Sequence, residues 1–131
     1  MPVELVQVLL AVALVPVHFV PYAIAANLHL GVDYTTGPRD EPVDLPPLCG
    51  RLKRAYENYL ESLPWFAIVM IVAHLSERAD GLITTLGWVY LGLRVAYVPA
   101  YVSGVPLLRS VIWMFATGAI FIALVWLLIG V

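Results

Sequence analysis

Apolar residues form four long runs along the chain, and short polar segments separate these runs. The runs cover about residues 5–27, 52–75, 82–103 and 107–130. A helix rises about 1.5 Å per residue, so about 20 residues cross a hydrocarbon core about 30 Å thick. No run alternates apolar and polar residues as the strands of a membrane barrel do. The pattern therefore predicts an all-α fold, a four-transmembrane-helix antiparallel bundle, with residues 1–131 as a single integral membrane domain.

The segments between the runs predict how the helices are connected. Residues 27–50 are rich in Gly, Pro and acidic residues, a composition that ends helices and favours an aqueous loop. Residues 76–81 and 104–106 are short enough for tight turns, so the second and third spans should be antiparallel neighbours. Pro16 and Pro21 lie inside the first span, where we expect them to kink the helix.

The composition fits a membrane location for the whole chain. Hydrophobic residues make up 62% and charged residues 12% of the sequence, whereas soluble domains carry about 25% charged residues. The net charge is −2, and no cluster of Lys and Arg is interleaved with aromatic residues, so nucleic-acid binding is not expected. No basic residue precedes the first apolar run, so we expect that run to remain in the protein rather than act as a cleaved signal.

Basic residues flank the predicted spans unequally, which predicts an orientation. One basic residue, Arg78, lies on the side of the short second connection. Five lie on the side of the long loop: Arg39, Arg51, Lys53, Arg54 and Arg109. Because positive loops stay in the cytoplasm, the long loop is predicted to be cytoplasmic and both termini to lie outside.

Polar residues inside the second and third spans are the strongest functional signal, because a charge at the centre of a span costs about 2.5–3.5 kcal/mol. On each span their spacing places them along one helical stripe. The stripe of the second span contains Arg51, Arg54, Asn58 and Glu61. The stripe of the third span contains Tyr90, Arg94, Tyr97 and Tyr101. Two such stripes on neighbouring helices predict a polar ladder between them.

Depth along the helices predicts the partners in this ladder. Glu61 and Arg94 are predicted to lie at the same depth, about 13–15 Å from the cytoplasmic end. We expect them to form a buried ion pair. Above the pair, Asn58 should face Tyr97, and Arg54 should face Tyr101.

The ladder has two interpretations. It can serve only to hold the helices together, because interhelical polar contacts in membranes stabilise by about 0.6–2 kcal/mol each. The basic residues near the cytoplasmic end nevertheless outnumber Glu57 and Glu61. This excess favours an anionic ligand, since arginine presents donors that match a carboxylate. Glu57 is interpreted as the salt-bridge partner of Lys53, one turn earlier.

The remaining reactive residues predict no further site. The lone Cys49 excludes an internal disulfide framework and is interpreted as an incidental loop thiol. The histidines are His18, His29 and His74. No two of them share an obvious ligand geometry, so no metal site is predicted.

Two segments resemble a known family. The run Arg54–Phe66 resembles the Arg-Ala-x-x-Asn-x-x-Glu-x-x-Pro-x-Phe signature of the MAPEG superfamily, membrane-associated proteins in eicosanoid and glutathione metabolism. Residues 90–101 resemble its third-helix pattern, in which an Arg is followed by Tyr three and seven positions later. The segments Gly37-Pro38-Arg39-Asp40 and Leu45-Pro46-Pro47 resemble the bacterial branch, which implies an inner-membrane location.

The resemblance implies a homotrimer that binds glutathione at the cytoplasmic side, between neighbouring subunits. The positions that match glutathione-contacting or pocket-forming residues are Arg54, Asn58, Glu61, Arg94, Tyr97 and Tyr101, with Arg51 as an addition. Arg109 is the nearest match to the Arg near the start of the fourth helix that activates the thiol, although its spacing is shifted by about one residue. Ser62 stands where one enzyme branch has Tyr, so no eicosanoid product is implied.

These implications lead to a functional expectation. We expect a membrane-bound protein that binds glutathione as co-substrate and acts as a glutathione transferase or peroxidase on lipophilic electrophiles. The alternative is a non-catalytic protein of the same fold with a structural or lipid-binding role. The sequence names neither the electrophile nor the thiol that the host makes.

Overall fold

The computed structural model describes residues 1–131 and contains five helices and no strands. The helices are α1 (Val3–Leu30), α2 (Val32–Thr36), α3 (Pro47–Leu75), α4 (Gly81–Ser103) and α5 (Leu108–Ile129). All but α2 are long and apolar enough to cross a membrane. The prediction of an all-α bundle with four spanning helices is therefore confirmed.

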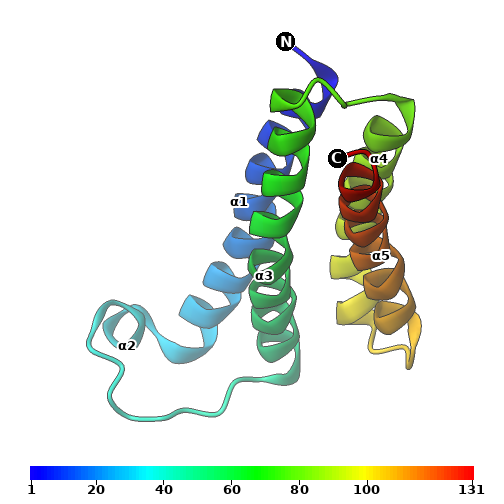
Figure 1. Cartoon of the computed structure of the whole chain (residues 1–131). Helices are drawn as coiled ribbons and strands as arrows, with labels where there is room; N and C mark the ends of the chain where they lie inside the picture. The colour runs from blue at the N-terminus through cyan, green and yellow to red at the C-terminus, as the bar shows by residue number, and fades with distance from the viewer.

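The four long helices form two hairpins that lie side by side (Figure 1). Helix α1 packs most extensively against α3, and α4 packs most extensively against α5. Both termini and the α3–α4 turn lie at one end of the bundle, which we call the turn end. The long α1–α3 connection and the α4–α5 turn lie at the opposite end, which we call the loop end.

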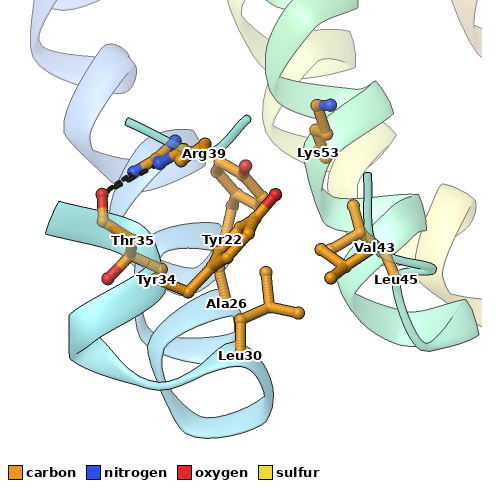
Figure 2. Close-up of a pocket in the computed structure, with 9 residues that line it drawn as sticks. All are labelled: Tyr22, Ala26, Leu30, Tyr34, Thr35, Arg39, Val43, Leu45 and Lys53. Carbon is orange, nitrogen blue, oxygen red and sulfur yellow. Dashed lines mark hydrogen bonds between the residues drawn. The ribbon is translucent and has the colours of Figure 1, made fainter. Parts of the chain in front are cut away.

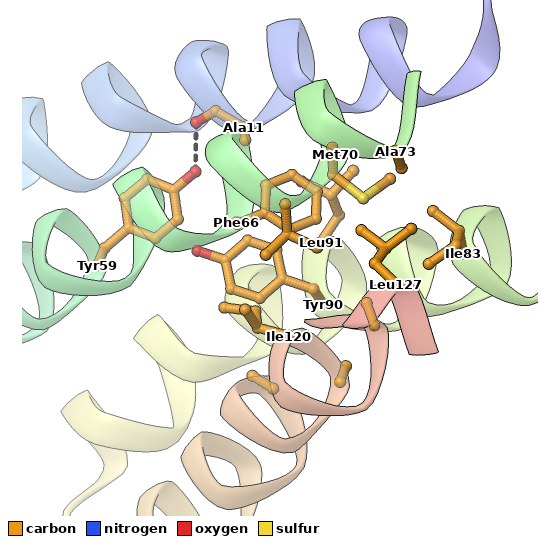
Figure 3. Packing of buried hydrophobic residues seen from close by; sticks show 14 residues of the cluster. Ala11, Tyr59, Phe66, Met70, Ala73, Ile83, Tyr90, Leu91, Ile120 and Leu127 are labelled. Atoms are coloured by element: carbon orange, nitrogen blue, oxygen red, sulfur yellow. Dashed lines mark hydrogen bonds between the residues drawn. The ribbon is translucent and has the colours of Figure 1, made fainter. Parts of the chain in front are cut away.

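Aromatic and small side chains fill the centre of the bundle (Figure 3). The rings of Phe66 and Tyr90 stack with their centroids 4.2 Å apart, and the Tyr59 hydroxyl donates to the carbonyl of Ala11. Small residues at the contacts let helix backbones approach closely, which helps helices associate in a bilayer. The buried alanines of this core are Ala11, Ala73, Ala116, Ala119 and Ala123.

Hydrogen bonds hold the α3–α4 turn against α5 at the turn end. The Asp80 carboxylate accepts from the backbone N–H of Ile83 at 3.0 Å, which caps α4, and from the indole N–H of Trp126 at 2.9 Å. These donors hold the pKa of the Asp80 carboxyl below its ordinary value. The Arg78 guanidinium donates to the carbonyls of Trp126, at 3.0 Å, and Leu127, so it satisfies the end of α5.

The long connection differs from the predicted aqueous loop. Helix α1 continues to Leu30, the short α2 follows Gly31, and α3 already begins at Pro47. Proline is well tolerated in the first turn of a helix, where the backbone N–H that it lacks would have no partner. Cys49 therefore lies buried in α3, and its interpretation as a loop thiol is wrong.

Helix α1 remains one helix through both of its prolines. In Figure 1 it diverges from α3 toward the loop end, where it leads into α2. The kink expected at Pro16 and Pro21 stays a prediction.

Candidate functional site

The predicted polar stripes meet at the loop end, where α3, α4 and the start of α5 come together. We call this group the arginine–tyrosine cluster: Arg51, Arg54, Asn58, Arg94, Tyr97, Tyr101 and Arg109. Helix α3 supplies the first three members, α4 the next three and α5 the last. The spacing along α3 and α4 places each set on one side of its helix.

The outer part of the cluster is built around Tyr101. The Arg54 Nε donates to the Tyr101 hydroxyl at 2.8 Å, which confirms the predicted pairing of these residues. The guanidinium of Arg109 lies 4.8 Å from the centre of the Tyr101 ring, within the range of a cation–π interaction. The Arg51 Nη1 donates to the carbonyl of Val102 at 3.1 Å, near the end of α4. Arg54 and Arg109 are both exposed on the isolated chain.

Arg94 is the buried centre of the cluster, with none of its surface exposed. Its Nη1 donates to the Asn58 Oδ1 at 2.8 Å. Its guanidinium lies 4.3 Å from the ring centre of Tyr97 and 5.3 Å from that of Tyr59. Its Nε and Nη2 have no hydrogen-bond partner. Neutral groups thus surround this cation, and part of its donor capacity is unused.

The predicted ion pair between Glu61 and Arg94 is wrong. Glu61 is exposed and lies in no ion pair, and Asn58 is the hydrogen-bond partner of Arg94 instead. The position of Asn58 opposite Tyr97 stays a prediction. The buried face of α3 runs through Tyr59, one position beyond the stripe that contains Asn58 and Glu61. This rotation turns Glu61 outward and leaves Asn58 at the edge of the helix contact.

The charges of the cluster are not balanced within the chain. Only two ion pairs within 4.0 Å occur, Lys53 with Glu57 at 3.8 Å and His74 with Glu4 at 2.8 Å. The first confirms the predicted i,i+4 partner of Lys53. The four arginines of the cluster therefore have no carboxylate partner. Arginine guanidinium groups without a carboxylate partner can bind an anionic ligand.

Two residues behind Arg94 were missed by sequence reasoning. Tyr59 is fully buried, and His18 of α1 stacks on its ring with the centroids 4.3 Å apart and the planes within 9°. The ring nitrogen Nδ1 of His18 lies 2.8 Å from the carbonyl oxygen of Leu14. The one available signal for Tyr59 was its helical spacing to Ser62 and Phe66, which marks an inward face. His18 gave no signal, because its partner lies on another helix.

The chain also contains no group of three or more His, Cys, Asp or Glu side chains that could hold a metal ion. The chemistry of the cluster is therefore that of arginine, tyrosine and amide donors.

Comparison with known proteins identifies the family. The family model described as MAPEG family matches residues 4–129, which is nearly the whole chain. No curated protein and no solved structure matches the chain. Together with the four candidate membrane spans, the family match shows a multi-pass integral membrane protein. The chain belongs to the MAPEG family.

Proposed function

We propose that the protein binds glutathione or a closely related thiol at the arginine–tyrosine cluster and uses it against lipophilic electrophiles from the bilayer. The observation that carries this proposal is the set of four arginines without a carboxylate partner. Glutathione has two carboxylates, which match arginine forks, and one ammonium group. The exposed carboxylate of Glu61, on the same stripe of α3, is available for that ammonium.

We assign separate roles in binding the thiol to several residues of the cluster. We assign the exposed Arg54 and the half-buried Arg51 to one carboxylate of the thiol. The Nε and Nη2 of the buried Arg94 remain without a partner within the chain. Tyr101 holds Arg54 through its hydroxyl and Arg109 through its ring. Because the family resemblance matches Arg109 to the arginine that activates the thiol, we assign Arg109 to the thiolate sulfur. A nearby cation lowers the pKa of a thiol and so raises the thiolate fraction at neutral pH.

The reaction then needs no metal or redox group. The thiol proton leaves to solvent, the sulfur electron pair forms a bond to the electrophilic carbon, and the leaving group departs with the electrons of its own bond. With a hydroperoxide the sulfur attacks the terminal oxygen, the O–O bond breaks, and the alkoxide takes up a proton and leaves as the alcohol. A second thiol then attacks the resulting sulfenic acid, which gives the disulfide and releases water. In both cases the arginines contribute by holding the thiolate in place and stabilising its charge.

The exposed position of Glu61 supports an oligomer. A carboxylate that faces lipid at membrane depth is costly, so such residues are usually covered by protein. In a homotrimer, as the family resemblance implies, a neighbouring subunit would cover Glu61 and complete the thiol site. We place this loop end in the cytoplasm, on the basis of the five basic residues on its side.

The alternative is a non-catalytic role in which the cluster only joins helices or binds lipid. The bonds of Arg54 to Tyr101 and of Arg51 to Val102 favour this alternative, because both link α3 to α4. A direct measurement separates the two functions.

The test is a glutathione titration of the detergent-purified protein at neutral pH, followed by the ultraviolet absorbance of the thiolate. We expect a saturable signal that Arg109→Ala abolishes, and an affinity about tenfold lower or more in Arg54→Ala, because charge-assisted hydrogen bonds are lost. The matched control is Arg39→Gln, which removes an arginine outside the cluster and should leave the affinity unchanged. A folded protein without a saturable signal would contradict the proposal and favour the alternative.

A further inference from the structure

Two adjoining cavities lie at the loop end, where the end of α1 faces α2 and the start of α3. Their volumes are ≈ 130 Å³ and ≈ 250 Å³. Both are lined by Tyr22 and Ala26 of α1, Thr35 of α2 and Arg39 of the loop. Lys53 of α3 completes the smaller one, and Figure 2 shows it across the cavity from Arg39. No member of the arginine–tyrosine cluster lines either cavity.

The lining of these cavities contains two cations and no acidic side chain. Arg39 and Lys53 are cationic, and neither cavity is lined by Asp or Glu. Arg39 has no carboxylate within 4.0 Å, although several acidic residues lie near it in sequence. Three of these acids, Asp33, Asp40 and Glu41, line another hollow of the loop, and Arg39 borders this hollow as well as the cavities. An anion is therefore attracted to these cavities, because their lining contains basic side chains and no acidic ones.

The two cations retain donors for a ligand. The Nε and Nη2 of Arg39 donate to the carbonyl of Thr35 at 2.8 and 2.5 Å, which fixes the guanidinium and leaves its Nη1 available. Lys53 contacts Glu57 at 3.8 Å, and both of these side chains are about half exposed, so the pair is weak. Tyr22 adds a phenol hydroxyl between them.

Apolar side chains complete the lining of the smaller cavity. They are Ala26, Leu30, Val43 and Leu45. Ala26 and Leu30 belong to the last turns of α1, where its long apolar run ends. Tyrosine and basic residues next to the end of an apolar span are the usual marks of the membrane–water boundary. A ligand at this depth therefore meets two cations together with apolar side chains.

We propose that these cavities bind the phosphate head group of an anionic phospholipid from the surrounding leaflet. The phosphate lies between Arg39 and Lys53, with the Tyr22 hydroxyl as a further donor, and the first part of an acyl chain lies along Leu30 and Val43. The group that is recognised is an anionic phosphate, and inorganic phosphate has the same oxygen atoms. The apolar wall favours the lipid as its source. The site is separate from the thiol site and does not depend on the proposed function.

The experiment measures binding of short-chain dioctanoyl phosphatidylglycerol to the detergent-purified full chain, by native mass spectrometry and by the shift of the thermal midpoint. Parallel arms use dioctanoyl phosphatidylcholine and inorganic phosphate at equal concentrations. We expect phosphatidylglycerol to bind best, and its affinity to fall about tenfold or more in the double variant Arg39→Gln, Lys53→Gln, since each basic residue near an anionic surface contributes to the attraction. Circular dichroism checks that this variant is folded.

A matched variant separates this proposal from the proposed function. Arg54→Gln also removes one exposed positive charge at the loop end, and it should keep the affinity for phosphatidylglycerol. Equal binding of phosphatidylglycerol by the wild type and the double variant would overturn the proposal. Equal affinity for phosphatidylcholine would overturn the anionic head group, and equal affinity for inorganic phosphate would overturn the lipid as ligand. None of these outcomes bears on glutathione binding, which is measured independently.

Discussion

The two ends of the bundle use their charged residues in different ways. At the turn end, the charged groups of the helix contacts are matched: Glu4 lies 2.8 Å from His74, Asp80 caps α4, and Arg78 donates to carbonyls at the end of α5. At the loop end, arginines lie against tyrosine rings and lack carboxylate partners. The comparison teaches that the charged groups of the turn end are used in contacts between helices, whereas the arginines of the loop end have no carboxylate partner within the chain.

The largest effect is expected from removing one arginine at each end. Arg78→Ala removes two charge-assisted hydrogen bonds to backbone carbonyls and should lower the free energy of unfolding by about 2 kcal/mol. Arg54→Ala removes one exposed hydrogen bond and should lower it by less than about 1 kcal/mol. Thermal melting in detergent measures both variants. Equal losses would show that the loop-end arginines are as structural as those of the turn end, and would break the comparison.

A smaller effect is expected from the α1–α4 contact in the turn-end half. Gly87 faces the Gln7 side chain, whose Nε2 donates to the carbonyl of Thr84 at 2.7 Å, and a Cβ at Gly87 would collide with the Gln7 amide. Gly87→Val should therefore destabilise the protein by about 1 kcal/mol more than Gly92→Val, because the Gln7 amide must move. Gly92 is the control, because a Cβ there meets no atom within 4 Å. Similar melting midpoints would contradict this close contact.

The smallest effect is expected from the pH dependence of the Asp80 cap. The pKa of Asp80 is lowered in the folded protein, so its stabilisation is present above its unfolded pKa and is lost as the pH falls through the folded value. We expect the midpoint difference between wild type and Asp80→Asn to shrink below pH ~4. Melting curves from pH 3 to 7 measure this difference. A constant difference across that range would show that the carboxylate charge is irrelevant to the cap.

Most of the fold could be predicted from the sequence, because a helix that spans a bilayer needs a long apolar run. Such a run has few other interpretations. The four long helices begin and end within a few residues of the apolar runs, except at the long loop. There the prediction erred because composition alone does not show that Pro47 starts a helix or that five residues form α2.

The site could be predicted only in part. Helical spacing grouped Arg51, Arg54 and Asn58 on α3, and Arg94, Tyr97 and Tyr101 on α4, since residues three and four positions apart share a face. It also grouped Glu61 with the first set, although Glu61 is exposed. Spacing does not fix how far a helix is rotated about its axis. The burial of Tyr59 and Phe66 sets that rotation for α3, which places Asn58 and not Glu61 against Arg94. Contacts between helices that are distant in sequence, such as the stacking of His18 on Tyr59, cannot be predicted from the residues next to either partner.

The arrangement of the long helices in two hairpins has a consequence for how the protein is made. Each hairpin joins helices that follow one another among the spans, so α1 and α3 can pair before α4 and α5 have left the ribosome. Each hairpin also returns to the side from which it started, and so enters the bilayer without carrying a large polar segment to the far side. The polar long loop and the short α4–α5 turn lie at the same end of the bundle, so both remain on one side of the bilayer. Biogenesis can therefore proceed as two successive insertions, followed by docking of two preformed halves.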